Sequence, residues 1–346
     1  MINRRTFIKS GVLTGMGLLT SDLSFSKESG TYENKKKRVG IIGLDTSHST
    51  AFTTLLNTTE TDEYKGYKVT AAYPYGSRTI ESSYKRIPGY IDEVKKYNVE
   101  IVDSIEDLLK KTDVILLETN DGRLHLEQAL PVFKAGKRVF IDKPVAASLV
   151  DAICIYQAAA DMNVPVFSAS SLRYMSNIDK IIKEDAAGKV LGANSFSPCT
   201  IEATHPDMFW YGIHGIEALF TVMGPGCKTV TRIHTADTDL ITGIWSDSRI
   251  GCFRGLRKGK TGYGGHVFGE KEIMTLGDYN GYTPLLNDII RFFETGIVPV
   301  TPEETLEIFK FMEAADESKR RNSAPVSTDE VWETAYEKAK KQGNKS

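Results

Sequence analysis

Arg138-Val139-Phe140-Ile141-Asp142-Lys143-Pro144 is the stretch that decides the fold of this chain. Its three apolar residues, two of them β-branched, are typical of a buried strand in a parallel sheet. The strand stops at an acid, a lysine and a proline, and Pro144 disfavours helical geometry at Lys143. Because open α/β sheets bind ligands at the carboxyl ends of their strands, we expect Lys143 to face a binding crevice. The alternative is an exposed lysine at a strand end.

Strands and helices alternate along the chain before this stretch. Further apolar strands are predicted over Arg38–Gly43, Lys68–Tyr73, Val99–Val102 and Val114–Leu117. Such alternation predicts a doubly wound parallel sheet. Its binding crevice would collect three polar strand ends, namely Gly43–His48, Thr119–Asn120 and Asp142–Pro144.

The pattern changes after a predicted helix over Ser171–Lys183. From Val190 onward, apolar and polar residues alternate between glycine-rich turns, which indicates an open, mostly antiparallel sheet. We therefore predict an α/β chain with a Rossmann-type domain over residues 36–147 and an α+β domain over 148–327. Residues 328–346 are predicted to form a surface helix and tail.

The composition is that of an ordinary globular protein. The 346 residues are 41% hydrophobic and 25% charged, with a formal net charge of -2. This near-neutral balance gives no electrostatic footprint for nucleic acid. The four cysteines are far apart and form no Cys-x-x-Cys, which argues against a zinc site or redox pair. We expect four buried thiols, with one disulfide as the alternative.

Residues 1–26 have the pattern of an export signal. Arg4-Arg5-Thr6-Phe7-Ile8-Lys9 precedes an uncharged run from Ser10 to Leu19 that is too short to span a bilayer. The paired arginines resemble the twin-arginine type, which exports folded proteins. We therefore expect a periplasmic protein without a stable membrane anchor, and a short cytoplasmic helix is the alternative.

Four segments in this order and spacing resemble the Gfo/Idh/MocA family of glucose–fructose oxidoreductase and inositol dehydrogenase relatives. The segments are Val114–Asn120 with His125, Ala135–Pro144, Gly212–Glu217 and Pro302–Ser318. The resemblance runs from Arg38 to about Ser327. It implies a Rossmann domain, sugar or cyclitol chemistry at a nicotinamide cofactor, and homo-oligomers formed through an open sheet.

The resemblance also implies that Lys143 and His214 act on the hydroxyl being oxidised. A histidine near neutral pKa is a suitable base for the hydroxyl proton, and an ammonium group stabilises the developing negative charge. The alternative for His214 is a helix-start histidine bonded to backbone.

Further candidates follow from the same resemblance. The carbohydrate substrate would contact Arg173, Tyr174, Trp210 and Tyr211, although core packing is an alternative for the tyrosines. The cofactor, NAD or NADP, would be bound by Gly43, Asp45, Thr46, Ser47, His48, Thr119, Asn120, His125 and Asp142.

The dinucleotide fingerprint is altered in this chain. It calls for three glycines, of which Gly43 keeps the first place while Asp45 and His48 take the second and third. A carboxylate at the second place repels a pyrophosphate. The acid expected after the second strand is missing, and Ser77 and Arg78 hint at a 2′-phosphate. Either the dinucleotide is held in an altered way or the chain no longer uses one.

Three functions follow from these observations. The first is an exported oxidoreductase acting on a sugar or polyol with a tightly bound nicotinamide cofactor. The second is a non-redox lyase or glycoside hydrolase that uses Asp45, His48, His205 or Asp207; His205 and Asp207 could also be read as metal ligands, although nothing fixes their geometry. The third is a non-catalytic carbohydrate-binding protein, against which the presence of both Lys143 and His214 counts.

Overall fold

The computed structural model describes residues 37–60 and 62–343, so the predicted export signal lies outside the described residues. Six parallel strands form the first sheet in the order β3-β2-β1-β4-β5-β6. The strands are β1 (Lys37–Ile42), β2 (Tyr67–Tyr73), β3 (Glu100–Ile101), β4 (Val114–Leu117), β5 (Val139–Ile141) and β6 (Val166–Phe167). This order confirms the predicted doubly wound sheet.

Helices cover both faces of this sheet because its central strands are apolar on both sides. One face packs on α4 (Ile105–Lys111), α5 (His125–Lys134) and α6 (Leu149–Asp161). The other face packs on α1 (Ser47–Thr58), α3 (Ile87–Lys95) and α9 (Thr283–Thr295), and the short α2 (Glu81–Tyr84) precedes α3. Helix α9 comes from the second half of the chain, so residues beyond 148 complete the core of the first sheet.

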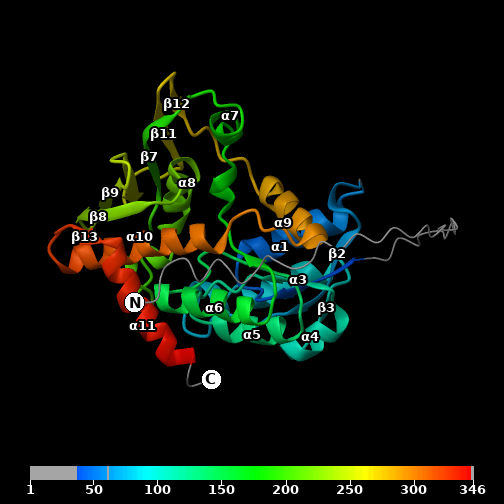
Figure 1. Cartoon of the computed structure of the whole chain (residues 1–346). Helices are drawn as coiled ribbons and strands as arrows, with labels where there is room; N and C mark the ends of the chain where they lie inside the picture. Colours follow the sequence, from blue (N-terminus) through cyan, green and yellow to red (C-terminus); the bar gives the residue numbers. More distant parts are fainter. Residues whose placement is uncertain (1–36, 61, 344–346) are drawn as a thin grey trace, which may run out of the picture. The chain divides into compact units, whose positions relative to one another are not determined.

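The second sheet has seven strands in the order β12-β11-β7-β10-β9-β8-β13. Only the β7–β10 pair is parallel within this sheet, which confirms the predicted, mostly antiparallel arrangement. The strands are β7 (Val190–Pro198), β8 (Cys227–His234), β9 (Thr238–Trp245), β10 (Ile250–Leu256), β11 (Gly264–Gly269), β12 (Ile273–Thr275) and β13 (Val326–Ser327). Its inner face packs on α8 (Ile213–Met223) and α10 (Pro302–Arg320), and α10 also contacts α6, as Figure 1 shows.

Three expectations need correction. The single helix predicted over Ser171–Lys183 is a 3-10 turn, Ser171–Tyr174, followed by α7 (Ile178–Ile182). The break arises because the N–H groups of Ser176 and Asn177 donate to carbonyls of the 276–278 segment rather than within a helix. Helix α11 (Thr328–Gly343) is not purely on the surface, since it buries a face against α6. All four cysteines are free, and two of them, Cys154 and Cys252, are only half-buried.

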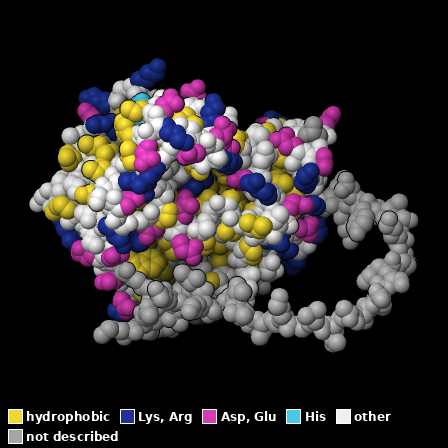
Figure 2. Space-filling view, turned by 45° about the horizontal axis from the view of Figure 1, so that its top comes forward, with side chains coloured by type: hydrophobic (Ala, Val, Ile, Leu, Met, Phe, Trp, Pro, Cys, Tyr) yellow, Lys and Arg dark blue, Asp and Glu magenta, His cyan; other side chains and the backbone are white. Residues whose placement is uncertain are grey.

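Within the described ranges, no helix combines the length and the apolar character that crossing a membrane requires. The outer face of the second sheet, however, carries several exposed apolar side chains. Figure 2 shows exposed apolar side chains at the left, where β8 and β9 lie in Figure 1. The outward-facing residues are 41% to 63% exposed and are Ile233, Ile244, Ile250, Phe268 and Ile273.

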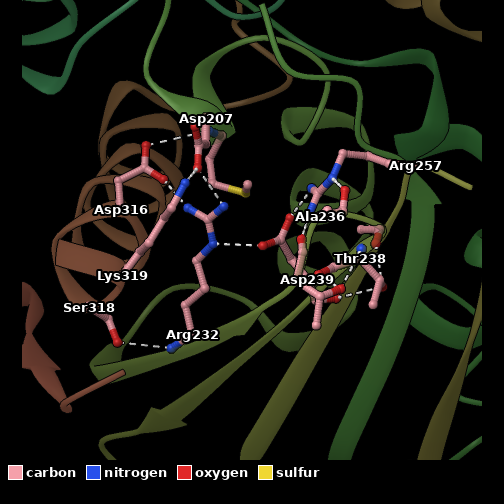
Figure 3. Close-up of polar contacts among 12 residues, drawn as sticks. Asp207, Arg232, Ala236, Thr238, Asp239, Arg257, Asp316, Ser318 and Lys319 are labelled. Atoms are coloured by element: carbon pink, nitrogen blue, oxygen red, sulfur yellow. Dashed lines mark hydrogen bonds and ion pairs between the residues drawn. The ribbon is translucent and has the colours of Figure 1, made fainter. Parts of the chain in front are cut away.

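A fully buried arginine, Arg232, ties the second sheet to its helices (Figure 3). Its Nε lies 2.9 Å from Asp239 on β9, and one terminal nitrogen lies 2.7 Å from Asp207. The other terminal nitrogen bonds to Asp316 on α10, and the backbone N–H donates to Ser318. Burial raises the pKa of Asp316 to about 7 although the charge of Arg232 lowers it, so without the arginine this carboxyl group would be protonated at neutral pH.

We expect Arg232→Met to lower the free energy of unfolding by about 3–5 kcal/mol, because three carboxylates would lose their buried partner. Urea denaturation followed by circular dichroism measures this change. The matched control is Arg249→Met, whose pair with Asp247 lies at a turn and should leave the midpoint nearly unchanged. Equal midpoints for both variants would contradict the role of Arg232.

Candidate functional site

Lys143 follows β5 at the carboxyl edge of the first sheet, and its side chain is 11% exposed. The carboxylate of Asp142 accepts the Lys143 backbone N–H at 2.8 Å and lies 3.3 Å from Nζ. Although burial alone would lower it, the charge of Asp142 holds the pKa of Lys143 above its usual value. Lys143 is therefore an ammonium ion at neutral pH.

His214 lies in the first turn of α8 and is 7% exposed. Its Nδ1 lies 2.7 Å from the hydroxyl of Ser170, whose backbone N–H donates to Glu217. Burial, and then the positive charge of Lys143, holds the pKa of His214 well below its ordinary value. The side chain is thus a neutral imidazole oriented by a hydroxyl, which is the state a general base needs.

The loop after β1 is built around a buried carboxylate rather than around glycine. Gly43 has φ +89°, and a Cβ there would lie 2.5 Å from the backbone nitrogen of Thr119. Asp45 is fully buried and accepts backbone N–H groups of Ser77 and Asn120, both at 2.9 Å. A Cβ at Gly76 would lie 2.1 Å from its Oδ2, so the end of β2 leaves room for this carboxylate.

Burial raises the pKa of Asp45 to about 6. With this pKa the carboxylate is largely ionised at neutral pH. It accepts two backbone N–H groups from the segments that follow β2 and β4, the strands on either side of β1. Thr46 caps α1 by accepting the His48 N–H, and Ser47 is exposed in the first turn. The cofactor contacts of both residues stay predictions.

His48, at the third glycine position, points into the same edge of the sheet. It is 5% exposed, and its Nδ1 lies 2.9 Å from Asp142 and 3.9 Å from Glu118. Its ring packs on Tyr282 at a centroid distance of 4.7 Å. Although burial alone would raise it, the charges of His48 and Lys143 hold the pKa of Asp142 below its usual value.

Glu118 is the site residue that sequence reasoning missed. It is fully buried at the end of β4, and neither carboxylate oxygen has a hydrogen-bond partner among the described residues. Burial, and then the charge of Asp142, raises the pKa of Glu118 well above its usual value. The available signal was an apolar strand ending in an acid, the pattern that also singled out Asp142.

The remaining cofactor candidates hold the strand-end loops together. The ring nitrogens of His125 lie 2.6 and 3.1 Å from the carbonyl oxygens of Thr119 and Val145. The side-chain amide of Asn120 donates to Ser83. These contacts give His125 and Asn120 a positioning role, and their contacts with a cofactor stay predictions.

The four substrate candidates separate into two pairs. Arg173 bonds to Glu217 and Glu304, and Tyr174 donates to Asp288, so both side chains are already engaged by acids. Tyr211, by contrast, lies beside His214 with ring centroids 4.8 Å apart. Trp210 packs on His205 at 5.0 Å. The substrate roles of all four stay predictions, and Tyr211 has the position that suits one.

His205 and Asp207 are not arranged as a pair of metal ligands. The Nε2 atom of His205 lies 3.4 Å from Asp121, which also bonds to Arg123. Asp207 is engaged by Arg232 and Lys319, as Figure 3 shows. The two side chains thus face different partners and are not placed to bind one metal ion together.

A cavity of about 690 Å³ lies at the end of β2, beside the start of α5. Its lining includes Tyr75, Arg78, Thr79, Ser104, Arg123 and Gln128. In doubly wound folds, the end of the second strand is where the ribose of a dinucleotide is recognised. A larger groove of about 970 Å³ runs between α1 and α3, lined in part by Ser47, but neither cavity is lined by Lys143 or His214.

Residues 37–170 match the model of an oxidoreductase family, Gfo/Idh/MocA, described by its NAD-binding Rossmann fold. A dehydrogenase of Aspergillus oryzae, aclE, is 26% identical over 167 residues, which are 46% of this chain and 44% of that protein. The match therefore spans less than half the length of this relative.

The fold is shared by solved structures, two of which are inositol dehydrogenases. The scyllo-inositol dehydrogenase of Lactobacillus casei, with bound NAD(H) and scyllo-inositol, is similar with a TM-score of 0.69 at 15% identity, over 85% of this chain and 100% of that chain. The myo-inositol 2-dehydrogenase of Lactobacillus plantarum gives 0.67 at 16% identity, over 85% and 99%. At these identities the likeness establishes the fold alone.

We expect the imidazole of His214 to stay neutral between about pH 6 and 8, and its pKa to rise in Lys143→Met because a nearby positive charge is removed. NMR titration of histidine-labelled protein measures this. The exposed Lys134→Met serves as control and should leave the His214 signal unmoved. An unchanged pKa in Lys143→Met would show that the two groups do not interact.

Proposed function

The chain belongs to the Gfo/Idh/MocA oxidoreductase family, and on this premise we propose that it oxidises a hydroxyl of a sugar or related polyol with a nicotinamide dinucleotide. The observation that carries the proposal is that Asp142 holds Lys143 at the carboxyl edge of a Rossmann sheet while Ser170 orients the His214 ring, on which the charge of Lys143 acts. The names of the similar inositol dehydrogenases favour cyclitols and pyranoses as the substrate class.

The chain's own residues supply the proton chemistry of such an oxidation. His214 accepts the hydroxyl proton while Ser170 orients the imidazole. Lys143, kept charged by Asp142, stabilises the negative charge that develops on the substrate oxygen. A nicotinamide dinucleotide, when bound, supplies the hydride acceptor. Tyr211 lies beside His214, where its ring can pack on the C–H face of a sugar.

The residues of this chain fit the adenosine of a dinucleotide but do not fit its pyrophosphate. The cavity at the end of β2 suits an adenosine, and Arg78 in its lining favours NADP. At the second glycine position, however, Asp45 presents a carboxylate and already accepts two backbone N–H groups. The pyrophosphate would have to be held away from this carboxylate, in an altered mode.

A non-redox lyase or glycoside hydrolase of the same fold is the second candidate, and Asp45 is the observation that favours it. A buried carboxylate whose pKa is about 6 is suited to acid–base work at neutral pH. A carbohydrate-binding protein without catalysis is the third. Export to the periplasm rests on residues 1–26 alone and stays part of the proposal.

We expect the chain to reduce NAD or NADP in the presence of inositols or pyranoses, and Lys143→Met and His214→Asn each to lower kcat by about 10²- to 10⁴-fold. Absorbance of the reduced nicotinamide measures the rate. Exposed residues provide the matched controls, Lys134→Met and His266→Asn, which should keep the wild-type rate.

Calorimetry with the dinucleotide alone separates binding from catalysis. We expect Asp45→Gly to tighten binding at least tenfold, since it removes a charge that repels the pyrophosphate. If neither the native chain nor Asp45→Gly binds NAD or NADP, the redox proposal fails and the non-redox candidate takes its place.

We propose a second copy of this chain as the partner of the exposed outer face of the second sheet. Burying five large apolar side chains would favour association. Sedimentation equilibrium should give a mass above that of one chain. Ile244→Lys, opposite Ile250 on this face, should shift the mass toward the monomer. The matched control is Lys134→Met, which alters an exposed residue of α5 away from this face and should leave the mass unchanged. A native monomer at micromolar concentration would refute this proposal.

A further inference from the structure

Three side chains at the carboxyl edge of the first sheet have the spacing of metal ligands. His48 from α1, Glu118 from the end of β4 and Asp142 from the end of β5 each offer one ligand atom, and these atoms lie within 4.8 Å of one another. All three residues are at least nine-tenths buried. Within the described ranges, no other group of three such side chains meets this spacing.

Glu118 gives this cluster a second, independent feature. Its two carboxylate oxygens are fully buried and have no hydrogen-bond donor among the described residues, while Oε2 lies 3.9 Å from the Nδ1 atom of His48. A buried charge without a partner is costly, so such a carboxylate is either protonated or bound to a cation.

The charges around Glu118 favour a cation. Three buried carboxylates, Asp45, Glu118 and Asp142, influence one another, and Lys143 is the ammonium group that acts on Glu118. Asp45 is satisfied by two backbone N–H groups, and Asp142 turns only one oxygen toward Lys143 Nζ. The other Asp142 oxygen accepts the Lys143 N–H and faces His48 Nδ1, so carboxylate oxygens from two residues meet one imidazole nitrogen where the three ligand atoms converge.

We propose that His48, Glu118 and Asp142 bind a divalent transition-metal ion. One imidazole nitrogen with two carboxylate oxygens suits Zn²⁺ or Mn²⁺. Three protein ligands also leave a coordination position for water or a substrate oxygen. Lys143 bonds to the far oxygen of Asp142, so the ion and the ammonium group would share this carboxylate without competing for the same atom.

This inference goes beyond the oxidoreductase proposal and does not rest on it. His48 stands where the dinucleotide fingerprint has its third glycine, and it forms the cluster with two strand-end acids. The histidine at this glycine position thus completes a set of three ligands. Binding of an ion to them can be measured without any nucleotide or substrate.

The test uses the full chain, freed of metal by chelation and titrated calorimetrically with ZnCl₂ and, separately, with MnCl₂. We expect one ion per chain for at least one of the two metals. Glu118→Gln, which keeps the side-chain shape and removes the charge, should weaken binding at least tenfold, and so should His48→Gln. The matched control, Glu100→Gln, alters an exposed acid on β3 and should bind as the native chain does.

Absence of a one-to-one ion in the native chain would overturn the proposal, and Glu118 would then be a buried neutral acid. A bound ion whose affinity is the same in Glu118→Gln and His48→Gln would overturn the choice of ligands. If either variant fails to fold, the titration of the native chain and of the other variant still tests the metal site. Dinucleotide binding is titrated separately, so failure of the oxidoreductase proposal is distinguishable from failure of the metal site.

Discussion

The buried carboxylate of Asp142 is the constraint on which the rest of the site depends. It ends β5, accepts the backbone N–H of Lys143, and lies between the Lys143 ammonium and the His48 ring. A carboxylate with no exposed surface must be paired, and here two side chains and one backbone donor pair it. The position and charge of Lys143 follow from that pairing. Burial lowers the pKa of His214, and the charge of Lys143 lowers it further.

The second half of the chain supplies further groups to this edge of the sheet. Helix α8 brings His214 to the strand ends, and Ser170, just beyond β6, fixes its ring. Helix α9 packs on α1 and the first sheet, while α10 packs between α6 and β8. The Arg232 network then holds α10 to the second sheet, so the placement of the helices depends on a buried ion cluster as well as on apolar packing.

Much of this arrangement could be predicted from local patterns. The strand ending at Asp142 and Lys143, the crevice formed by three strand ends, and the helix carrying His214 all follow from periodicity and order along the chain. The break after Tyr174 could not be predicted, because carbonyls about a hundred residues later supply the hydrogen bonds there. The role of Glu118 could not be predicted either, because it depends on which acids and rings surround the side chain.

By itself, the sequence determined the fold class, the strand ends that form the candidate site, and the departure from glycine at Asp45 and His48. These are local properties, because the periodicity of hydrophobic residues and the residue types can be read within a short stretch of sequence. Only the tertiary structure decided that Asp45 is satisfied by backbone N–H groups, that Arg173 and Tyr174 are engaged by acids, and that His48, Glu118 and Asp142 converge. The partners of a buried polar group come from distant strands and helices, so its role is settled by packing.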